Sequence, residues 1–274
     1  MFEFVIIPLL LAIATAVICG VVGTLTVVRS NTYVAGAVSH TILAGLGFAQ
    51  YSNVTGLLPF YISPEMASLI TAIVVAIIIS FLQYKGRMRK DSSLSAVWAI
   101  GMAIGLFFMT ITPGYQTDLL RYMFGSIAVV TAFDVWFVSF LAFFIVVCCI
   151  CFWRGIVATC FNSDLLRLNG GKAFFFELVI SIISAIAIVA LVKTVGIVLV
   201  IALITLPAIA ALGLHSRLTS AMVLSALFTF MSLAFGVFTS IYCDIEAAAP
   251  SVVFAAMIVF FVWLIRRINK NEKN

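Results

Sequence analysis

His40 is the most telling ionisable side chain in this sequence, because it stands in a stretch that is otherwise apolar and rich in small residues. If this stretch is a helix, Gly36 and Ala37 precede the imidazole on its face, and Ala44 and Gly47 follow it. Such a bare face lets another backbone approach closely, or leaves a narrow passage beside the ring. An imidazole at membrane depth is costly without a polar partner or a wet cavity. His40 therefore either lies on an ion path or is a structural histidine that donates to a carbonyl.

A single imidazole is an incomplete site for a transition metal, which prefers several nitrogen, oxygen or sulfur ligands. Other ligands must contribute if His40 binds a metal ion. An incomplete site suits transport, because an ion held in a closed shell would leave slowly. Two copies of the chain, packed about a twofold axis, could each present His40 to a shared path.

A second group of residues could form a gate. Asp118 and Asp134 flank an amphipathic stretch whose apolar pattern is broken by Gly125 and Ser126. This pattern predicts a short hairpin or re-entrant piece at the outer face, or else an interfacial helix anchored by its aromatic residues. Pro207 lies within a later apolar run, where it must kink the helix or end a hydrogen-bond ladder. A kink suits a moving helix, although static bundles also contain them.

The polar segment FNSDLLRLNGG has the character of a short capped helix. Asn162 or Ser163 can cap its start, and Asp164 suits the positive first turn. Asn169 and Gly170 can end it in a left-handed conformation. We expect an amphipathic helix on the cytoplasmic face, either contacting a soluble partner or lying on the membrane surface.

The elements that must position these residues are membrane-spanning helices. Hydrophobic residues make up 65% of the chain and charged residues 9%, and the mean hydropathy is +1.29. This composition predicts an all-α polytopic membrane protein with one membrane domain over residues 1–274. A span needs about 20 mostly apolar residues. The second candidate run is short, rich in glycine and interrupted by His40, so a broken or tilted element and a count of eight stay open. The nine candidate runs are residues 4–28, 33–50, 66–84, 93–112, 131–153, 173–192, 194–212, 218–242 and 250–265.

The distribution of basic residues predicts the orientation of these spans. When the carboxyl terminus is placed in the cytoplasm, every Lys and Arg except Arg121 and Lys193 falls on the inner side. The amino terminus is then external. Acidic residues favour the outer face, where their field would draw cations, unless the outer loops merely avoid Lys and Arg.

Several classes of enzyme are excluded by missing motifs. The sequence has no G-x-x-x-x-G-K-[ST] loop, so the chain cannot hydrolyse ATP unaided. It also lacks H-E-x-x-H and G-x-S-x-G, which argues against an intramembrane hydrolase. We predict a non-enzymatic chain with no catalytic residues, no permanently bound cofactor and no nucleic-acid partner.

Taken together, these segments resemble the permease subunit of bacterial ABC importers for zinc, manganese or iron, the ABC-3 family. YVAGAVSHTILAG at residues 33–45 is similar to the family segment G-D-A-L-S-H-A, and DLLRYMFGSI at 118–127 to D-L-L-S-Y-L-F-G-N-I. VGIVLVIALITLPAIAA at 195–211 and the polar FNSDLLRLNG segment also match family patterns, and these two are the more specific.

This resemblance implies a bundle of eight to nine spans of the cobalamin-importer type in the bacterial inner membrane. The permease would pair with a second copy or a sister permease and sit on two ATPase subunits. A periplasmic or lipid-anchored metal-binding protein would deliver a divalent metal ion. By position, the resemblance assigns His40 to the metal path. It assigns four residues to ATPase coupling: Asp164, Leu165, Asn169 and Gly170.

Two departures and one alternative function accompany this resemblance. Family members commonly carry Asp one turn before the motif histidine, where this chain has Gly36, and the loop at 244–250 also differs. A carboxylate beside the imidazole would attract a divalent ion more strongly than His40 alone. The alternative function is a secondary cation carrier driven by a proton gradient, with His40 or Glu177 titrating. Such a carrier would move ions without an ATPase.

Overall fold

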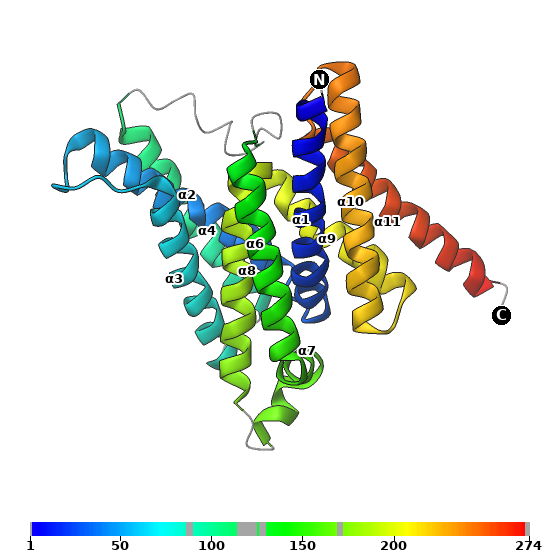
Figure 1. Ribbon diagram of the computed structural model, residues 1–274. Coiled ribbons are helices and arrows are strands. Elements are labelled where there is room, and N and C mark those ends of the chain that lie inside the picture. The colour runs from blue at the N-terminus through cyan, green and yellow to red at the C-terminus, as the bar shows by residue number, and fades with distance from the viewer. Residues whose placement is uncertain (1, 86–89, 114–124, 126–129, 169–171, 272–274) are drawn as a thin grey trace. The chain divides into compact units, whose positions relative to one another are not determined.

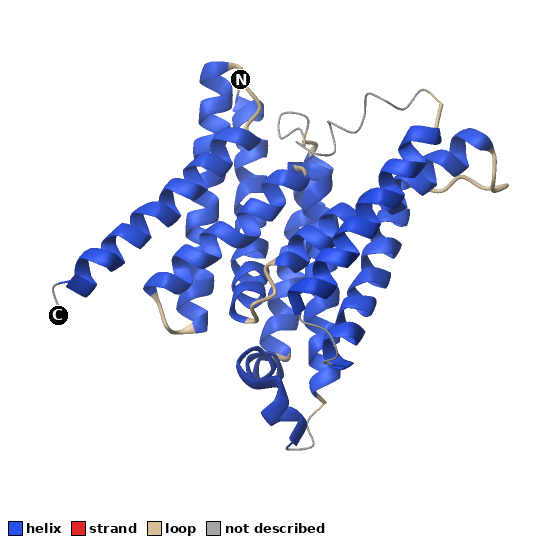
Figure 2. Cartoon of the chain, turned by 180° about the vertical axis from the view of Figure 1, so that it is seen from behind, coloured by secondary structure: helices blue, strands red, loops and turns tan. Residues whose placement is uncertain are grey.

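The computed structural model describes residues 2–85, 90–113, 125, 130–168 and 172–271. These residues form helices and connecting loops, with no strand among them (Figures 1 and 2). The helices are α1 (Phe2–Val28), α2 (Tyr33–Thr55), α3 (Pro64–Lys85), α4 (Lys90–Ile111), α6 (Ala132–Cys151), α7 (Trp153–Leu168), α8 (Ala173–Val195), α9 (Ile197–Leu214), α10 (Leu218–Cys243) and α11 (Ala248–Asn271).

The predicted membrane spans are confirmed as helices. Each of the nine apolar runs coincides with one helix, with ends that differ by a few residues. Eight helices of the described chain are long and apolar enough to cross a membrane: α1, α3, α4, α6, α8, α9, α10 and α11. The correspondence arises because a segment in hydrocarbon must satisfy all its backbone hydrogen bonds internally, which an apolar helix of this length does.

The exception is α2, the helix that carries His40. It is continuous over 23 residues, so the broken alternative is wrong, while the tilted alternative stays a prediction. It is also absent from the eight apolar helices, because Ser, Thr, His, Asn and Gln interrupt its sequence. Fifteen of its 23 residues are buried, and it packs against α3 and α4. A helix enclosed by protein needs no apolar surface toward lipid.

The helices form two compact units. The first contains α1, α6, α9, α10 and α11, and the second contains α2, α3, α4, α7 and all but the last three residues of α8. Whether the chain folds as one membrane domain stays a prediction.

In the first unit, α1 packs against α6, α9 and α10, and it lies alongside α10 (Figure 1). Two glycines of α1 allow this close approach. A side chain on Gly20 would overlap the Met222 carbonyl of α10, and one on Gly23 would overlap the Ile204 carbonyl of α9. The interface therefore depends on small residues that bring backbones together, as is common where lipid removes the hydrophobic drive for helix association.

In the second unit, α2 and α4 meet along a similar seam. A Cβ on Gly101 of α4 would lie 2.6 Å from the Thr41 hydroxyl oxygen, and one on Gly105 would lie 2.8 Å from the Leu43 carbonyl carbon. Gly101 and Gly105 have the small-x-x-x-small spacing that places both on one helix face. The bare face predicted around His40 thus packs against α4, with the Trp98 side chain covering Gly36 and the Gly105 carbonyl approaching Gly47.

A single residue, Gly196, separates α8 from α9. Its backbone has φ +88° and ψ 159°, a region that only glycine adopts readily. Gly125, also at positive φ, lies so close that a side chain on it would overlap the backbone of Val195 and Gly196. The chain therefore passes from one helix to the next at a junction that excludes side chains.

The structure corrects the predicted start of the polar segment before residue 172. We expected a helix capped at Asn162 or Ser163, but α7 begins at Trp153 and contains both residues in its interior. It ends at Leu168, next to the Asn169 and Gly170 where the helix was expected to stop. The helix can start early because no proline follows Trp153 within α7 and Gly155, its one glycine, lies in the first turn.

Candidate functional site

The imidazole of His40 stacks on the indole of Trp98, which comes from α4. The two ring centroids are 4.8 Å apart and the ring planes differ by 16°. His40 is partly exposed, but its Nδ1 atom is buried and has no hydrogen-bond partner among the described atoms. The carbonyl partner expected of a purely structural histidine is therefore not found at Nδ1. Trp98 is the neighbour that the sequence analysis missed.

Gly36 lies one helical turn before His40 and faces the same indole. A Cβ built on Gly36 would stand 2.6 Å from Cζ3 of Trp98 and 3.0 Å from Cε3 and Cη2. Carbon atoms in contact normally lie about 3.5–4.0 Å apart. The indole thus occupies the space that any side chain at position 36 would need. The sequence did contain a signal for this contact, because Trp98, Gly101 and Gly105 share the helix face that packs on α2.

Within the described residues, no group of three or more His, Cys, Asp or Glu side chains is close enough to hold a metal ion. Since Nδ1 of His40 is buried, Nε2 is the ring nitrogen that this residue can offer to a metal ion.

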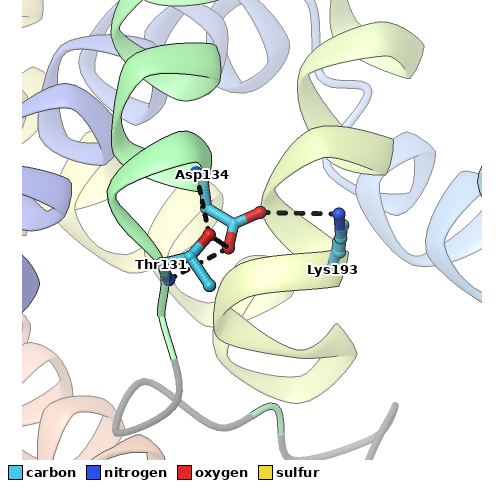
Figure 3. Close-up of polar contacts among 3 residues, drawn as sticks. All are labelled: Thr131, Asp134 and Lys193. Carbon is cyan, nitrogen blue, oxygen red and sulfur yellow. Dashed lines mark hydrogen bonds and ion pairs between the residues drawn. The ribbon is translucent and has the colours of Figure 1, made fainter.

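Asp134, one of the three predicted gate residues, lies in the first turn of α6 (Figure 3). Its Oδ2 accepts hydrogen bonds from the Thr131 hydroxyl at 2.6 Å and the Thr131 backbone N–H at 3.1 Å. The backbone N–H of Asp134 donates to Thr131 Oγ1 at 3.3 Å. This reciprocal arrangement is a capping box, which satisfies donors that the start of the helix leaves open.

The other carboxylate oxygen of Asp134 pairs with Lys193 at the end of α8. The Lys193 Nζ to Asp134 Oδ1 distance is 3.4 Å, and the two side chains are 50% and 16% exposed (Figure 3). The pair ties the start of α6 to the junction at Gly196, three residues after Lys193. A half-exposed pair of this kind can open at modest cost.

Of the other two predicted gate residues, the structure describes Pro207. Asp118 lies outside the described residues. Pro207 is buried inside α9, which continues for seven residues beyond it to Leu214, so the proline does not end the helix.

Two of the four predicted coupling residues lie near the end of α7. Asp164 and Leu165 are within its final turns, and Asn169 and Gly170 lie outside the described residues. Two of the described helices, α2 and α7, are not candidate spans, and α7 joins the spans α6 and α8.

The chain is similar in sequence to curated membrane proteins of metal transport systems, three of which illustrate the range. A "Probable metal transport system membrane protein" of Chlamydia muridarum is 36% identical over 175 residues, which cover 63% of this chain and 59% of that protein, less than two thirds of its length. The "Manganese transport system membrane protein MntC" of Halalkalibacterium halodurans is 27% identical over 89% of this chain and 81% of its own length. The "High-affinity zinc uptake system membrane protein ZnuB" of Haemophilus influenzae is 22% identical over 97% of this chain and 99% of its own length.

The fold is also similar to a solved structure, "PsaBC from Streptococcus pneumoniae in complex with Fab". The TM-score is 0.80 at 22% sequence identity, with 96% of this chain and 92% of that chain covered. At this identity the likeness concerns the fold. The family described as "ABC 3 transport family" matches residues 1–267, a range that contains His40, the pair at Asp134 and the whole of α7. The chain therefore belongs to the ABC 3 transport family.

Proposed function

We propose that this chain is the membrane-spanning permease subunit of an ATP-driven importer for a divalent transition metal, with zinc, manganese and iron as the candidate cargoes. The observation that carries the proposal is the family match over residues 1–267, which includes every motif on which the sequence prediction depended. The names of the relatives, which mention manganese and zinc uptake, support the cargo class.

The proposal includes three kinds of partner. A separate ATPase supplies the energy, an extracytoplasmic protein delivers the metal ion, and a second permease, identical or related, completes the path. The lack of a phosphate-binding loop in the sequence supports the need for an external ATPase. The chain lies in the bacterial inner membrane with its carboxyl terminus in the cytoplasm, which the cluster of Arg266, Arg267, Lys270 and Lys273 supports.

The end of α7 is the proposed site of contact with the ATPase. ATP binding closes the nucleotide subunits, and a helix held between two spans would pass that displacement to α6 and α8. The bounds of α7 support this role, because a rigid helix runs from Trp153 up to the predicted coupling residues, and Asp164 and Leu165 lie in its final turns.

The Asp134–Lys193 pair is the proposed gate. It joins α6 to the end of α8, next to the glycine junction where α9 starts, so a rotation of either helix stretches the ion pair. Its partial exposure keeps the cost of opening low. On the proposed path, His40 contacts the passing ion without closing a full coordination shell around it.

Reconstitution separates this function from the alternative, a proton-driven carrier. The permease is placed in liposomes alone, or with an ATPase and an extracytoplasmic metal-binding protein from the same organism, and uptake of Zn²⁺, Mn²⁺ and Fe²⁺ is measured. We expect uptake only with both partners and ATP. Uptake by the permease alone, driven by a pH gradient, would establish the carrier instead.

The coupling role is tested with two matched substitutions. Asp164→Asn should lower metal-stimulated ATP hydrolysis by the assembled complex, whereas Asp244→Asn, on an exposed turn after α10, should leave it unchanged. Equal effects of the two substitutions would remove α7 from the proposal.

A further inference from the structure

We infer that Trp98 determines how strongly the path holds its ion. Its indole fills the space that a second ligand at position 36 of α2 would need, so that His40 meets a divalent metal ion without a ligand one turn before it. The inference rests on the proposed function, metal import. It adds to that function a residue that sets the affinity of the His40 site for the transported metal ion.

The first support is steric. Residues four apart on a helix share a face, so a side chain at position 36 would point toward the same space as His40. A Cβ at position 36 would lie only 2.6 Å from Cζ3 of Trp98, which leaves no room there even for a methyl group. A carboxylate at this position could approach a metal ion on His40 only after the indole had moved.

The second support is the state of the imidazole. Histidines that bind metals almost always donate their second ring N–H to a carboxylate, a carbonyl or a water, and loss of that partner costs about 10–100-fold in metal affinity. The Nδ1 atom of His40 is buried without such a partner, and one face of the ring is covered by Trp98. A metal ion on Nε2 would therefore leave Nδ1–H unsatisfied, which weakens binding.

The third support is the composition of the surroundings. The described chain contains no group of three His, Cys, Asp or Glu side chains that could hold a metal ion, so His40 has no ready set of additional ligands. The ion then keeps water or other small ligands on its remaining positions and leaves quickly. Selection among divalent metals must come from elsewhere in the assembly.

The experiment builds the missing ligand. The full chain and its variants are placed in lipid nanodiscs, dialysed against Zn²⁺, and the retained zinc is measured per chain. The Gly36→Asp/Trp98→Ala double variant places a carboxylate one turn before His40 and removes the indole. We expect it to bind zinc about tenfold more tightly than the unmodified protein or more, which is the scale on which ligand environment alters metal affinity.

Three further variants make the comparison specific. Adding His40→Ala to the double variant should abolish the gain, and Gly36→Ala/Trp98→Ala should show no gain because it lacks the carboxylate. Trp136→Ala, which removes a highly exposed tryptophan of α6, is the matched control for loss of an indole. Helix content and gel-filtration behaviour verify that each variant is folded.

Two results would overturn the inference. One is an unmodified protein that already retains one zinc per chain in a His40-dependent manner. The other is a folded double variant that binds zinc no more tightly. If the double variant does not fold, the inference is tested by the fluorescence of Trp98, in a variant whose other three tryptophans are replaced by phenylalanine. Quenching of this fluorescence by micromolar Co²⁺ that is lost in His40→Ala would also overturn the inference.

Transport separates this inference from the proposed function. In the complete transporter, the double variant should import metal more slowly than the unmodified protein, because the ion leaves a stronger site more slowly. A complete transporter that imports no metal in any form would refute the proposed function, while the zinc-binding comparison would still stand.

Discussion

Replacing Gly36 with alanine should destabilise the protein only while Trp98 is present. The added methyl group would lie 2.6 Å from one ring carbon and 3.0 Å from two others, an overlap of about 1 Å with each normal contact distance. Overpacking of this kind costs about 1–3 kcal/mol. The higher helix propensity of alanine relative to glycine stabilises the folded protein by about 1 kcal/mol. The net loss in the free energy of unfolding is then about 0–2 kcal/mol.

The same substitution in a Trp98→Ala background removes the overlap and leaves only the gain in helix propensity. Trp98→Ala alone should cost about 3–5 kcal/mol, because it empties a large space. Gly36→Ala should then stabilise that variant by about 1 kcal/mol. The two substitutions are therefore coupled by about 1–3 kcal/mol, within the range found for residues in contact.

The assay is reversible unfolding of the detergent-solubilised protein by SDS, followed by circular dichroism, in a double-mutant cycle. Gly213→Ala is the matched control, since its nearest non-local atom would lie at an ordinary 3.4 Å. This control should behave identically in both backgrounds. If Gly36→Ala has the same effect with and without Trp98, the steric account of the pair is refuted.

Four further predictions concern the junction, the helix cap, the ion pair and the imidazole. Gly196→Ala should destabilise the protein by about 1–3 kcal/mol in the same unfolding assay, because φ +88° and ψ 159° suit glycine alone; a neutral result would refute the strain argument. Thr131→Ala should lower the free energy of unfolding by about 1 kcal/mol through loss of the α6 cap. A double-mutant cycle of Asp134→Asn with Lys193→Met should give a coupling energy of up to about 1 kcal/mol that falls with added salt. A coupling energy insensitive to salt would contradict the solvent-exposed pair. His40→Ala should reduce metal uptake by the complete transporter at unchanged ATPase assembly, as judged by co-purification; unchanged uptake would remove His40 from the path.

Much of the fold could be predicted from local sequence, because the membrane imposes a local rule. A spanning helix must be about 20 residues long, mostly apolar, and internally hydrogen-bonded. The nine predicted runs consequently match nine helices. Local reasoning was wrong at α7, where Asn162 and Ser163 had the character of a helix start although the helix begins at Trp153. A capping residue indicates that a helix can start there, and it does not prevent an upstream segment from continuing through it.

The candidate site divides in the same way between sequence and tertiary structure. The sequence alone determined that small residues surround His40 and that Gly36 would stand one turn before it in a helix, since both follow from spacing along the chain; that the helix is continuous came from the structure. Only the tertiary structure decided what covers them, because Trp98 reaches α2 through the register of α4, set by the contacts of Gly101 and Gly105. The Asp134–Lys193 pair likewise joins residues far apart in the chain. Periodicity fixes which residues share a helix face, but the rotation and height of neighbouring helices depend on packing between them, which no single segment encodes.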